Sequence, residues 1–491
     1  MNNKTLTTGK HLNRRVAIRT LSGGFGSIAL AAMATGETLA ETAVGPLDAK
    51  QTHFAARAKR VIMLTMNGAP SHVDTFDYKP ALQKAGDKNG RGDRPSRLMP
   101  SPWKFDRHGD SGLWVSELLP ELSRHADRLC MLHGMHTDQP NHAMAQQAAH
   151  TGTSQFVRPS LGAWSVYGLG TENVDLPGYV ALGEAKGPNF GSSFLPTVYG
   201  ATGVSTGAAS GRPGSKRPEL KRPGSKRPGP KQTGVGGDQP RGGTSAVPNI
   251  TNPIVDKATQ RRQIDFLQTL NRQKMARDRD DSQIDGLIQS YELAFRMQDT
   301  MPALVDLSGE TAATKALYGI DQGPSSAFGT QCLMARRMVE SGVRFVELNH
   351  GNWDHHNDLK NGMESRCAEI DRPIAGLLTD LAQRDLLRDT LVIWAGEFGR
   401  TPHGENGDGR GHNNQGYTTF MAGGGVKPGY QYGATDPYGY EAVEGRMHTH
   451  DWHATILHLL GLDHQRLTYP HAGRPFRLTN VAGKVARDIL A

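Results

Sequence analysis

The sequence predicts an α/β protein, specifically a three-layer α/β/α sandwich with a mainly parallel central sheet. Three observations support this prediction. From residue 55 onward, short apolar runs alternate with segments of helical periodicity, which is the pattern of a layered α/β fold. The 491 residues are enough for one large domain with a sizeable core. Polar residues follow almost every apolar run, as expected where parallel strands end at a ligand site.

The main domain is expected to cover residues 57–491. Six apolar runs are predicted as strands, at 61–66, 129–133, 179–182, 343–348, 390–394 and 418–422. Five segments are predicted as helices, at 120–126, 144–149, 331–341, 364–383 and 452–460, the last with Asp451 as its N-cap. Residues 259–298 are helical in pattern and heavily charged, which predicts a peripheral helix, or a pair broken near Asp280.

The first residues have the anatomy of a signal peptide. Arg14 and Arg15 precede a short apolar stretch at 23–34, and Thr38-Leu39-Ala40 offers a small-residue cleavage site. The paired arginines indicate the twin-arginine route, which exports folded protein, so residues 1–43 are predicted to be removed in the periplasm or outside the cell. A mitochondrial-type presequence or a basic tail is the alternative. No other apolar run is long enough to predict a transmembrane anchor in the mature protein.

The positive charge is concentrated in one insert. The chain has a formal net charge of +8, and residues 210–245 alone hold nine Lys or Arg against Glu219 and Asp238. The insert, 205–248, is rich in Gly and Pro and is expected to be disordered. It could contact an acidic polymer or lipid surface, but no aromatic residue is interleaved to stack on bases, so no specific nucleic-acid partner is predicted. Three cysteines without Cys-x-x-Cys spacing are expected in the core: Cys130, Cys332 and Cys367.

Candidate metal ligands follow three of the predicted strands. His72 and Asp74 come after the first strand, two positions apart, so an extended backbone would point both to one side. The stretch 349–358 after the fourth strand holds the densest group, with Asp354 and His356. Glu397 comes directly after the fifth strand.

His412 completes the candidate ligand set, in a loop flanked by glycines. Carboxylate with imidazole predicts a divalent metal, zinc or manganese rather than calcium or magnesium. A single loop histidine more often makes an ordinary hydrogen bond, and an Asp after a strand often caps a helix. Four separate segments bearing such residues, most of them at strand ends, favour one shared site. In the C-terminal group His448–His453, capping explains the residues as well as a metal does.

Candidate catalytic residues lie near the second and fifth strands. Arg400 is placed to clamp a tetrahedral oxyanion. The segment 133–142 follows a strand and opens a helix, where free backbone amides hold anions. Thr137 is the only hydroxyl in it, and Asn141 with His142 stands at the helix start. A covalent nucleophile is therefore supported by Thr137 alone.

The sequence resembles the DUF1501 family of exported proteins, which is grouped with the alkaline phosphatase and sulfatase superfamily. The motifs that carry the resemblance are RVIMLTMNGAPSHVDTFDYKP, HGNWDHHND, GEFGRTP, GRGHN and the long tail from Ala422. The resemblance implies an alkaline phosphatase-like sandwich that binds one or two divalent metals and acts on phosphate or sulfate esters. It also implies that Asp354 and His356 form one ligand pair, with Glu397 as the strand-end acid and His412 as the late metal histidine.

Three positions depart from the wider superfamily. Asn67-Gly68 stands where Asp-Gly is usual, Glu397-Phe398 where Asp-His is usual, and Asn141-His142 where a helix start carries Ser, Thr or Cys. We therefore expect a single metal, a water activated by it, or a site that binds without turnover. The first hypothesis is an exported metal-dependent hydrolase of small-molecule or glycan phosphate or sulfate esters. The alternative is a noncatalytic exported protein that binds an anionic glycan or an envelope partner.

Overall fold

The computed structural model describes residues 45–85, 98–183, 187–205, 250, 254–275, 282–321 and 323–491. These residues belong to one unit, Gly45–Ala491. The predicted signal segment 1–43 lies outside the described residues, as does the basic insert 205–248 apart from Ser205. In the described part of the chain, no helix has both the length and the apolar character needed to cross a membrane.

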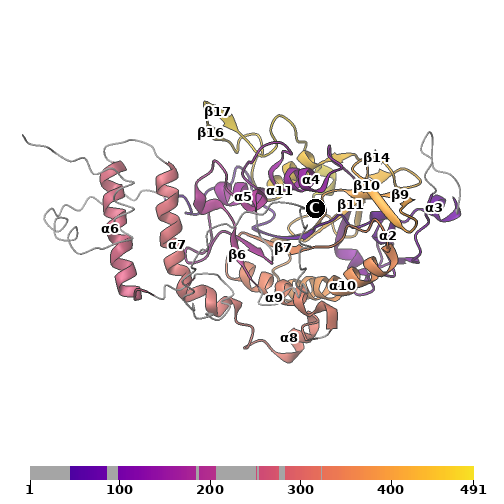
Figure 1. Ribbon diagram of the computed structural model, residues 1–491, viewed down its shortest axis with the longest axis horizontal. Helices are drawn as coiled ribbons and strands as arrows, with labels where there is room; N and C mark the ends of the chain where they lie inside the picture. Colours follow the sequence, from indigo (N-terminus) through magenta and orange to yellow (C-terminus); the bar gives the residue numbers. More distant parts are fainter. Residues whose placement is uncertain are drawn as a thin grey trace, which may run out of the picture. The chain divides into compact units, whose positions relative to one another are not determined.

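A mostly parallel sheet forms the centre of the fold, as the sequence predicts (Figure 1). All six predicted strands lie in it, and only β11 runs antiparallel to its neighbours. The strands follow in the order β12 (Tyr430–Tyr432), β4 (Leu129–His136), β11 (Tyr417–Ala422), β8 (Thr390–Ala395), β1 (Arg60–Met66), β7 (Phe345–His350), β5 (Tyr179–Leu182) and β6 (Thr202–Val204), with β15 (Met447–His448) beside β4.

The direction of these strands brings distant segments to one edge of the sheet. β1 pairs in parallel with both β7 and β8, so the three strands end side by side. Because β11 is antiparallel to both β8 and β4, β4 also ends at this edge. The polar segments that follow β1, β4, β7 and β8 therefore meet there, which is where α/β sheets bind their ligands.

Helices cover both faces of the sheet. Figure 1 shows α4 (His142–Thr151), α5 (Leu161–Leu169) and α11 (Thr449–Leu459) on one side, with α9 (Ser326–Glu340) and α10 (Leu359–Gln383) on the other. Contacts agree with this, since α5 packs against β5 and β7 while α9 packs against β1 and β7. Strands covered on both faces need continuous apolar runs, and six of the seven residues of β1 are buried.

The segment predicted as peripheral contains two helices, α6 (Lys257–Met275) and α7 (Ser282–Val305), and α7 packs against α9. The segment predicted as a helix at 120–126 is instead a 3-10 helix, η1 (Leu122–Arg128). The cysteines Cys130, Cys332 and Cys367 are buried thiols, as expected. The short helices are α2 (His72–Thr75), α3 (Pro80–Ala85), α8 (Ala312–Leu317), η2 (Pro188–Phe190), η3 (Thr197–Tyr199), η4 (Gly323–Ser325) and η5 (Arg487–Ile489).

Four strand pairs lie outside the central sheet, and one of them borders its ligand edge. β9 (Gly399–Glu405) and β10 (Gly409–Asn413) form an antiparallel hairpin that carries Arg400, Glu405, Arg410 and His412. The other pairs are β2 (Phe105–His108) with β3 (Leu113–Ser116), β13 (Ala434–Thr435) with β14 (Ala442–Glu444), and β16 (Tyr469–His471) with β17 (Arg474–Phe476).

Candidate metal centre

Four side chains from three separate segments meet at the ligand edge of the sheet. They are His142 at the start of α4, Asp354 and His356 in the loop after β7, and His412 on β10. One nitrogen or oxygen atom from each lies within 4.8 Å of the corresponding atom of every other. This group is termed the histidine–aspartate cluster below.

The spacing within the cluster is that of ligands around a single ion. Asp354 Oδ1 lies 3.2 Å from His142 Nε2, 2.9 Å from His356 Nε2 and 3.4 Å from His412 Nε2. The Nε2 atoms of His356 and His412 are 2.9 Å apart. Four ligands around a zinc ion at about 2.0–2.1 Å stand about 3.3 Å from one another. The cluster therefore has the dimensions of a metal site.

The other ring nitrogen of each histidine determines where its proton sits. His142 Nδ1 lies 2.6 Å from Glu397 Oε1, and His356 Nδ1 lies 2.8 Å from Glu405 Oε2. His412 Nδ1 lies 2.7 Å from the carbonyl oxygen of Pro140. Carboxylate and carbonyl oxygens only accept, so we assign the proton of each neutral ring to Nδ1.

Each neutral ring then presents the lone pair of Nε2 to the same point in space. Two such lone pairs at 2.9 Å repel unless a cation or a second proton lies between them. His142 Nε2 is buried and has no hydrogen-bond partner among the described residues, although Asp354 Oδ1 is near. Three imidazole nitrogens and one carboxylate oxygen suit zinc, manganese or iron. The residues present therefore fit a divalent cation.

Arg400 keeps the acidic member of the cluster charged. Its guanidinium donates to Asp354 Oδ1 at 2.6 Å. Burial alone would raise the pKa of Asp354, but the hydrogen bond and charge of Arg400, with the nearby His142 and His356, lower it to about 2. Asp354 is thus ionised, and ready to bind a cation, throughout the physiological range.

The cluster is open to solvent on one side. The side chain of Asp354 is 42% exposed, and those of His142 and His412 are 25% and 24% exposed. Structural zinc sites are closed by four protein ligands, whereas catalytic sites keep a position for water or substrate. The exposure here leaves room for a further ligand beside the four protein atoms.

The turn after β1 brings the loop of Asp354 into place. Gly68 has φ of +107°, and a Cβ atom there would stand 2.7 Å from the backbone nitrogen of Asp354. Only glycine fits such an approach. The backbone nitrogen of Trp353 also donates to the carbonyl oxygen of Asn67 at 3.2 Å. The Asn67-Gly68 pair therefore shapes the cluster through its backbone.

Glu397 lies just outside the cluster and supports it. Its side chain is buried and, besides His142, accepts hydrogen bonds from Gly68 N at 2.9 Å and Gln146 Nε2 at 3.1 Å. Its Oε1 fixes the ring of His142, while Oε2 is buried without a hydrogen-bond partner among the described residues, so the role of Glu397 as a metal ligand stays a prediction. A carboxylate behind a ligand histidine holds the tautomer and increases its basicity.

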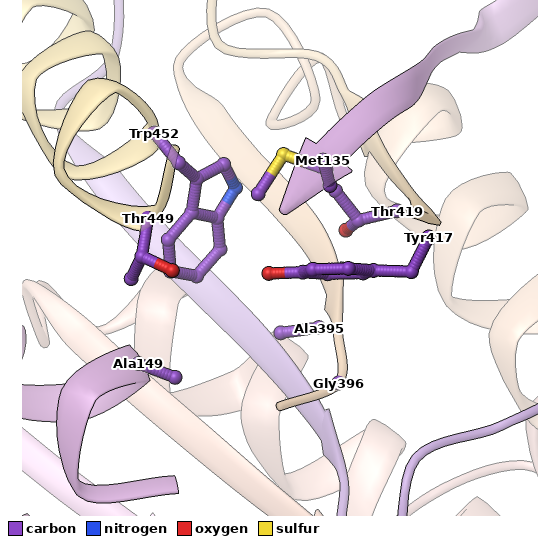
Figure 2. Close-up of a pocket in the computed structure, with 8 residues that line it drawn as sticks. All are labelled: Met135, Ala149, Ala395, Gly396, Tyr417, Thr419, Thr449 and Trp452. Atoms are coloured by element: carbon purple, nitrogen blue, oxygen red, sulfur yellow. The ribbon is translucent and has the colours of Figure 1, made fainter. Parts of the chain in front are cut away.

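A small cavity lies behind the segment that carries Glu397, lined by Met135, Ala149, Ala395, Gly396, Tyr417, Thr419, Thr449 and Trp452 (Figure 2). Its volume of about 10 Å³ is the size of one water molecule. Figure 2 shows the Tyr417 hydroxyl pointing toward Thr449. The cavity is too small for a substrate, so this tight packing serves to hold the strand end in place.

The prediction that His72 and Asp74 bind metal is wrong. Asp74 is fully buried and accepts from Arg410 Nε at 2.6 Å and Nη2 at 3.0 Å. His72 Nε2 lies 2.8 Å from the carbonyl oxygen of Gly439. Both begin the short helix α2, which turns them into the interior instead of along an extended loop. They tie the loop after β1 to the hairpin and to the C-terminal region.

Arg400 is not the anion clamp that the sequence suggested. It is 1% exposed, and its guanidinium is occupied by Asp354, by Ala69 O at 2.9 Å and Arg410 O at 3.2 Å, and by Gly68 O. Four of the five N–H donors of this buried guanidinium point at protein oxygens, which leaves little to hold a substrate anion. Arg400 supports Asp354 and the turn after β1.

The candidate nucleophile segment has a structural role. Asn141 caps α4, since its side chain accepts from the backbone nitrogen of Met144. Thr137 is buried and bonded through its backbone to Asn414, and none of the described hydrogen bonds joins its hydroxyl to the cluster. His142, predicted to be catalytic, is instead the fourth member of the cluster. Its place at a helix start that follows a strand was the available signal.

The C-terminal histidines are explained by capping. His448, not Asp451, is the N-cap of α11. His448 Nδ1 accepts from the backbone nitrogen of His450 at 3.2 Å, while Asp451 Oδ2 accepts from that of His448 at 3.0 Å. This reciprocal arrangement satisfies backbone donors at the helix start.

The chain matches the model of one protein family, and several solved structures match it at low sequence identity. Residues 58–490 match the family model described as "Protein of unknown function (DUF1501)". No curated protein matches the chain.

Among solved structures, Ps i-CgsB in complex with k-i-k-neocarrahexaose is 11% identical, with 82% of this chain and 72% of that chain covered and a TM-score of 0.35. The PsFucS1 sulfatase from Pseudoalteromonas sp. is 15% identical, with 83% and 68% covered and a TM-score of 0.33. Phosphonate monoester hydrolase SpPMH from Silicibacter pomeroyi is 12% identical, with 82% and 73% covered and a TM-score of 0.29.

Proposed function

Because the chain belongs to the DUF1501 family, we propose that it is a metal-dependent protein that hydrolyses phosphate or sulfate esters at the histidine–aspartate cluster. One observation carries this proposal. Three imidazole lone pairs and one ionised carboxylate oxygen converge, while each ring is fixed by an acceptor behind it. Such an arrangement favours a bound cation, which would relieve the repulsion between the lone pairs.

A divalent cation at this position would polarise the ester and lower the pKa of a water molecule. The protein supplies the rest. His142, Asp354, His356 and His412 hold the cation, and their exposed side admits the ester. Glu397 and Glu405 orient two of the rings, and Arg400 keeps Asp354 ionised.

We propose direct hydrolysis without a covalent enzyme intermediate. No described contact links the hydroxyl of Thr137 to the cluster, and the helix start where a nucleophile is usual carries Asn141 as a cap. Water oxygen would then attack phosphorus or sulfur, and the ester oxygen would leave as the alcohol after taking up a proton. The balance of atoms needs only water and the ester.

Export is the second part of the proposal. Arg14 and Arg15 and the apolar stretch behind them support the twin-arginine route. That route carries folded protein, which suits a chain that takes up its metal before export. Fractionation of the native host tests this step: a Lys-Lys replacement of the pair is expected to leave the protein in the cytoplasm.

Metal analysis of the purified mature protein tests the hydrolase. We expect about one zinc, manganese or iron per chain and turnover of aryl phosphate or aryl sulfate. Asp354→Ala and His412→Ala should lose both metal and turnover, whereas Asp110→Ala, a change at an exposed aspartate outside the cluster, should lose neither. A folded, metal-free and inactive wild type, still inactive after metal addition, would disprove the proposal.

A noncatalytic role is the second candidate. The hydrogen bonds of Arg400 to protein oxygens favour the noncatalytic role, because Arg400 is then not available to hold the ester anion at the cluster. Stoichiometric metal with no turnover of either ester class would support this candidate over the hydrolase.

A further inference from the structure

A second surface, built from three segments, carries positive charge, although Asp451 and Asp463 lie beside the last of them. Residues 153–171, 185–204 and 464–487 contain no Asp or Glu, whereas the last of them contains Arg466, Arg474, Arg477, Lys484 and Arg487. The segments meet around the hairpin of β16 and β17, where Phe194 packs against Phe476 at 5.0 Å between ring centroids. Clustered positive charge of this kind attracts anionic polymers.

Two arginines on this surface stack on one aromatic ring. The guanidinium carbons of Arg158 and Arg474 lie 5.2 Å and 4.1 Å from the ring centroid of Phe476. Burial and the charge of Arg474 lower the pKa of Arg158. Among the described residues, neither arginine forms an ion pair with a carboxylate. Two neighbouring guanidinium groups without a counter-charge are suited to bind an anion.

Aromatic rings and apolar side chains complete the surface. Phe194 and His471 stack at 4.8 Å with planes 16° apart, and Phe156 lies 5.8 Å from Arg158. The side chain of Phe156 is 58% exposed, an unusual exposure for so large an apolar ring. The six residues Phe156, Arg158, Phe194, His471, Arg474 and Phe476 are termed the arginine platform.

Helix α4 connects the platform to the histidine–aspartate cluster. His142 begins α4, and Gln147 on the same helix donates to the carbonyl oxygen of Phe156 at 2.6 Å. At its end, a Cβ atom on Gly152 would stand 2.1 Å from the carbonyl oxygen of Leu478, just after β17. The ten residues of α4 span about 15 Å. The first residue of α4 therefore belongs to the cluster, while later residues of the helix contact the segments that carry the platform.

We infer that the arginine platform binds a sulfated or phosphorylated polysaccharide. Its guanidinium groups pair with the ester anions, and the exposed ring of Phe156 packs against a sugar ring. This binding stands whether or not the cluster is an enzyme. The further statement that the bound polymer is the substrate, with one of its esters reaching the cluster along α4, rests on the proposed hydrolase function.

Nucleic acid and lipid fit the platform less well. Base stacking needs open aromatic faces, but Phe476 carries two guanidinium groups and Phe194 is stacked on His471. Insertion into a lipid surface needs several large apolar side chains in one place. Among the described large apolar side chains of the three segments, only Phe156, the adjoining Val157 and the separate Val481 are exposed.

Binding of the full mature chain to dextran sulfate, with neutral dextran as the blank, tests the platform. We expect binding only to the sulfated polymer and only weak binding to inorganic sulfate. Arg158→Gln with Arg474→Gln should weaken the affinity about tenfold or more. The slope of log affinity against log salt should fall by about two, one for each lost charge.

Arg107→Gln is the matched control. Arg107 also stacks on an aromatic ring, Trp114 at 5.0 Å, but it follows Asp106 in sequence. The Arg107→Gln variant should bind dextran sulfate as tightly as the wild type does. Equal binding by the double variant would overturn the platform, because the basic insert at 205–248 would then be sufficient. Tighter binding to oligo-dT or to anionic vesicles would overturn the polysaccharide assignment.

Two variants distinguish a failure of the polysaccharide-binding proposal from a failure of the hydrolase proposal. Asp354→Ala should keep polymer binding within about twofold, because its contacts lie at the other end of α4. The double arginine variant should keep turnover of a small aryl ester. Loss of polymer binding in Asp354→Ala would show that the cluster, not the platform, holds the anion.

Discussion

The histidine–aspartate cluster and the Asp74–Arg410 pair lie at the same edge of the sheet and contain similar polar residues. They differ in how their charges and protons are matched. Asp74 and Arg410 are both fully buried, and each oxygen of the carboxylate meets a guanidinium donor. In the cluster, three Nε2 lone pairs and one carboxylate face one another at a partly exposed point.

This contrast separates a structural polar group from a binding site. A buried pair in which every donor meets an acceptor needs nothing more from outside the protein. Lone pairs that face one another need a cation or a further proton between them, and both must come from outside the protein. Each region contains an aspartate that follows a strand of the sheet, Asp74 after β1 and Asp354 after β7, so the groups that face each carboxylate make the distinction.

The largest predicted effect comes from breaking the buried pair. Asp74→Ala leaves the Arg410 charge buried and unpaired, which should reduce the free energy of unfolding by about 3–5 kcal/mol. Asp354→Ala should reduce it by less in metal-free buffer, because Asp354 is 42% exposed and the buried Arg400 keeps its hydrogen bonds to backbone carbonyl oxygens. Urea unfolding with chelator present measures both.

The paired replacement Asp74→Leu with Arg410→Met is the control for this prediction, because it removes both charges and should recover most of the lost stability. If, in metal-free buffer, Asp354→Ala proved as destabilising as Asp74→Ala, the cluster would be a structural polar group and not a binding site.

The next effect concerns the carboxylates behind the rings. Glu397→Gln should weaken metal affinity about 10–100-fold, since it removes the charge that raises the basicity of His142. Glu405→Gln is the matched change behind His356, and it should weaken affinity less because Glu405 is 43% exposed and screened by water. Competition with a metal-sensitive dye gives both constants. Equal losses of metal affinity in the two variants would mean that burial of the carboxylate does not determine how strongly it supports its histidine.

A smaller effect is expected from pH. Burial lowers the pKa of His453 to about 3, and burial with the charge of Arg128 lowers that of His125 to about 4. Between their usual pKa of about 6.5 and these values, the unfolded chain binds protons that the folded chain does not. Stability should therefore fall as pH drops below about 6.5, by up to about 1.4 kcal/mol per pH unit for each group.

Thermal unfolding in chelator from pH 7.5 to 4.5 measures this loss, and His453→Gln should make the profile flatter. An unchanged profile in that variant would assign the acid sensitivity to other groups.

The smallest effect is expected at Thr137. Thr137→Ala should change turnover of an aryl ester less than about twofold, because no described contact brings its hydroxyl to the cluster. The test is steady-state kinetics on matched metal-loaded protein. A loss of a hundredfold or more would point to a covalent step and would replace direct attack by water.

Much of the fold follows from the sequence. The alternation of apolar runs and helical segments predicts the sheet, and the strand ends predict where Asp354, His356 and His412 lie. The pairing of Asp74 with Arg410 does not follow, because it joins residues 336 positions apart through the register of a hairpin. That register is irregular between Arg410 and His412. Such irregularities re-aim side chains, which is consistent with Arg410 lying in the interior while His412 reaches the cluster.

The roles of Arg400 and His142 needed the coordinates for another reason. A guanidinium near a strand end can grip a ligand or hold the carbonyls of a turn, and only the positions of Gly68 and Ala69 decide which. His142 could be read as an anion-binding residue from its place at a helix start. Its orientation in the cluster depends on Glu397, which lies 255 residues away.

His142 and Asp354 are separated by some two hundred residues, and a cation shared between them would fasten the chain like a reversible cross-link. Closing so long a loop costs the unfolded ensemble much of its freedom. Binding of the ion would therefore stabilise the whole folded domain against unfolding. A cell that withholds the ion would control how long each copy survives proteolysis, independently of any reaction the copy performs.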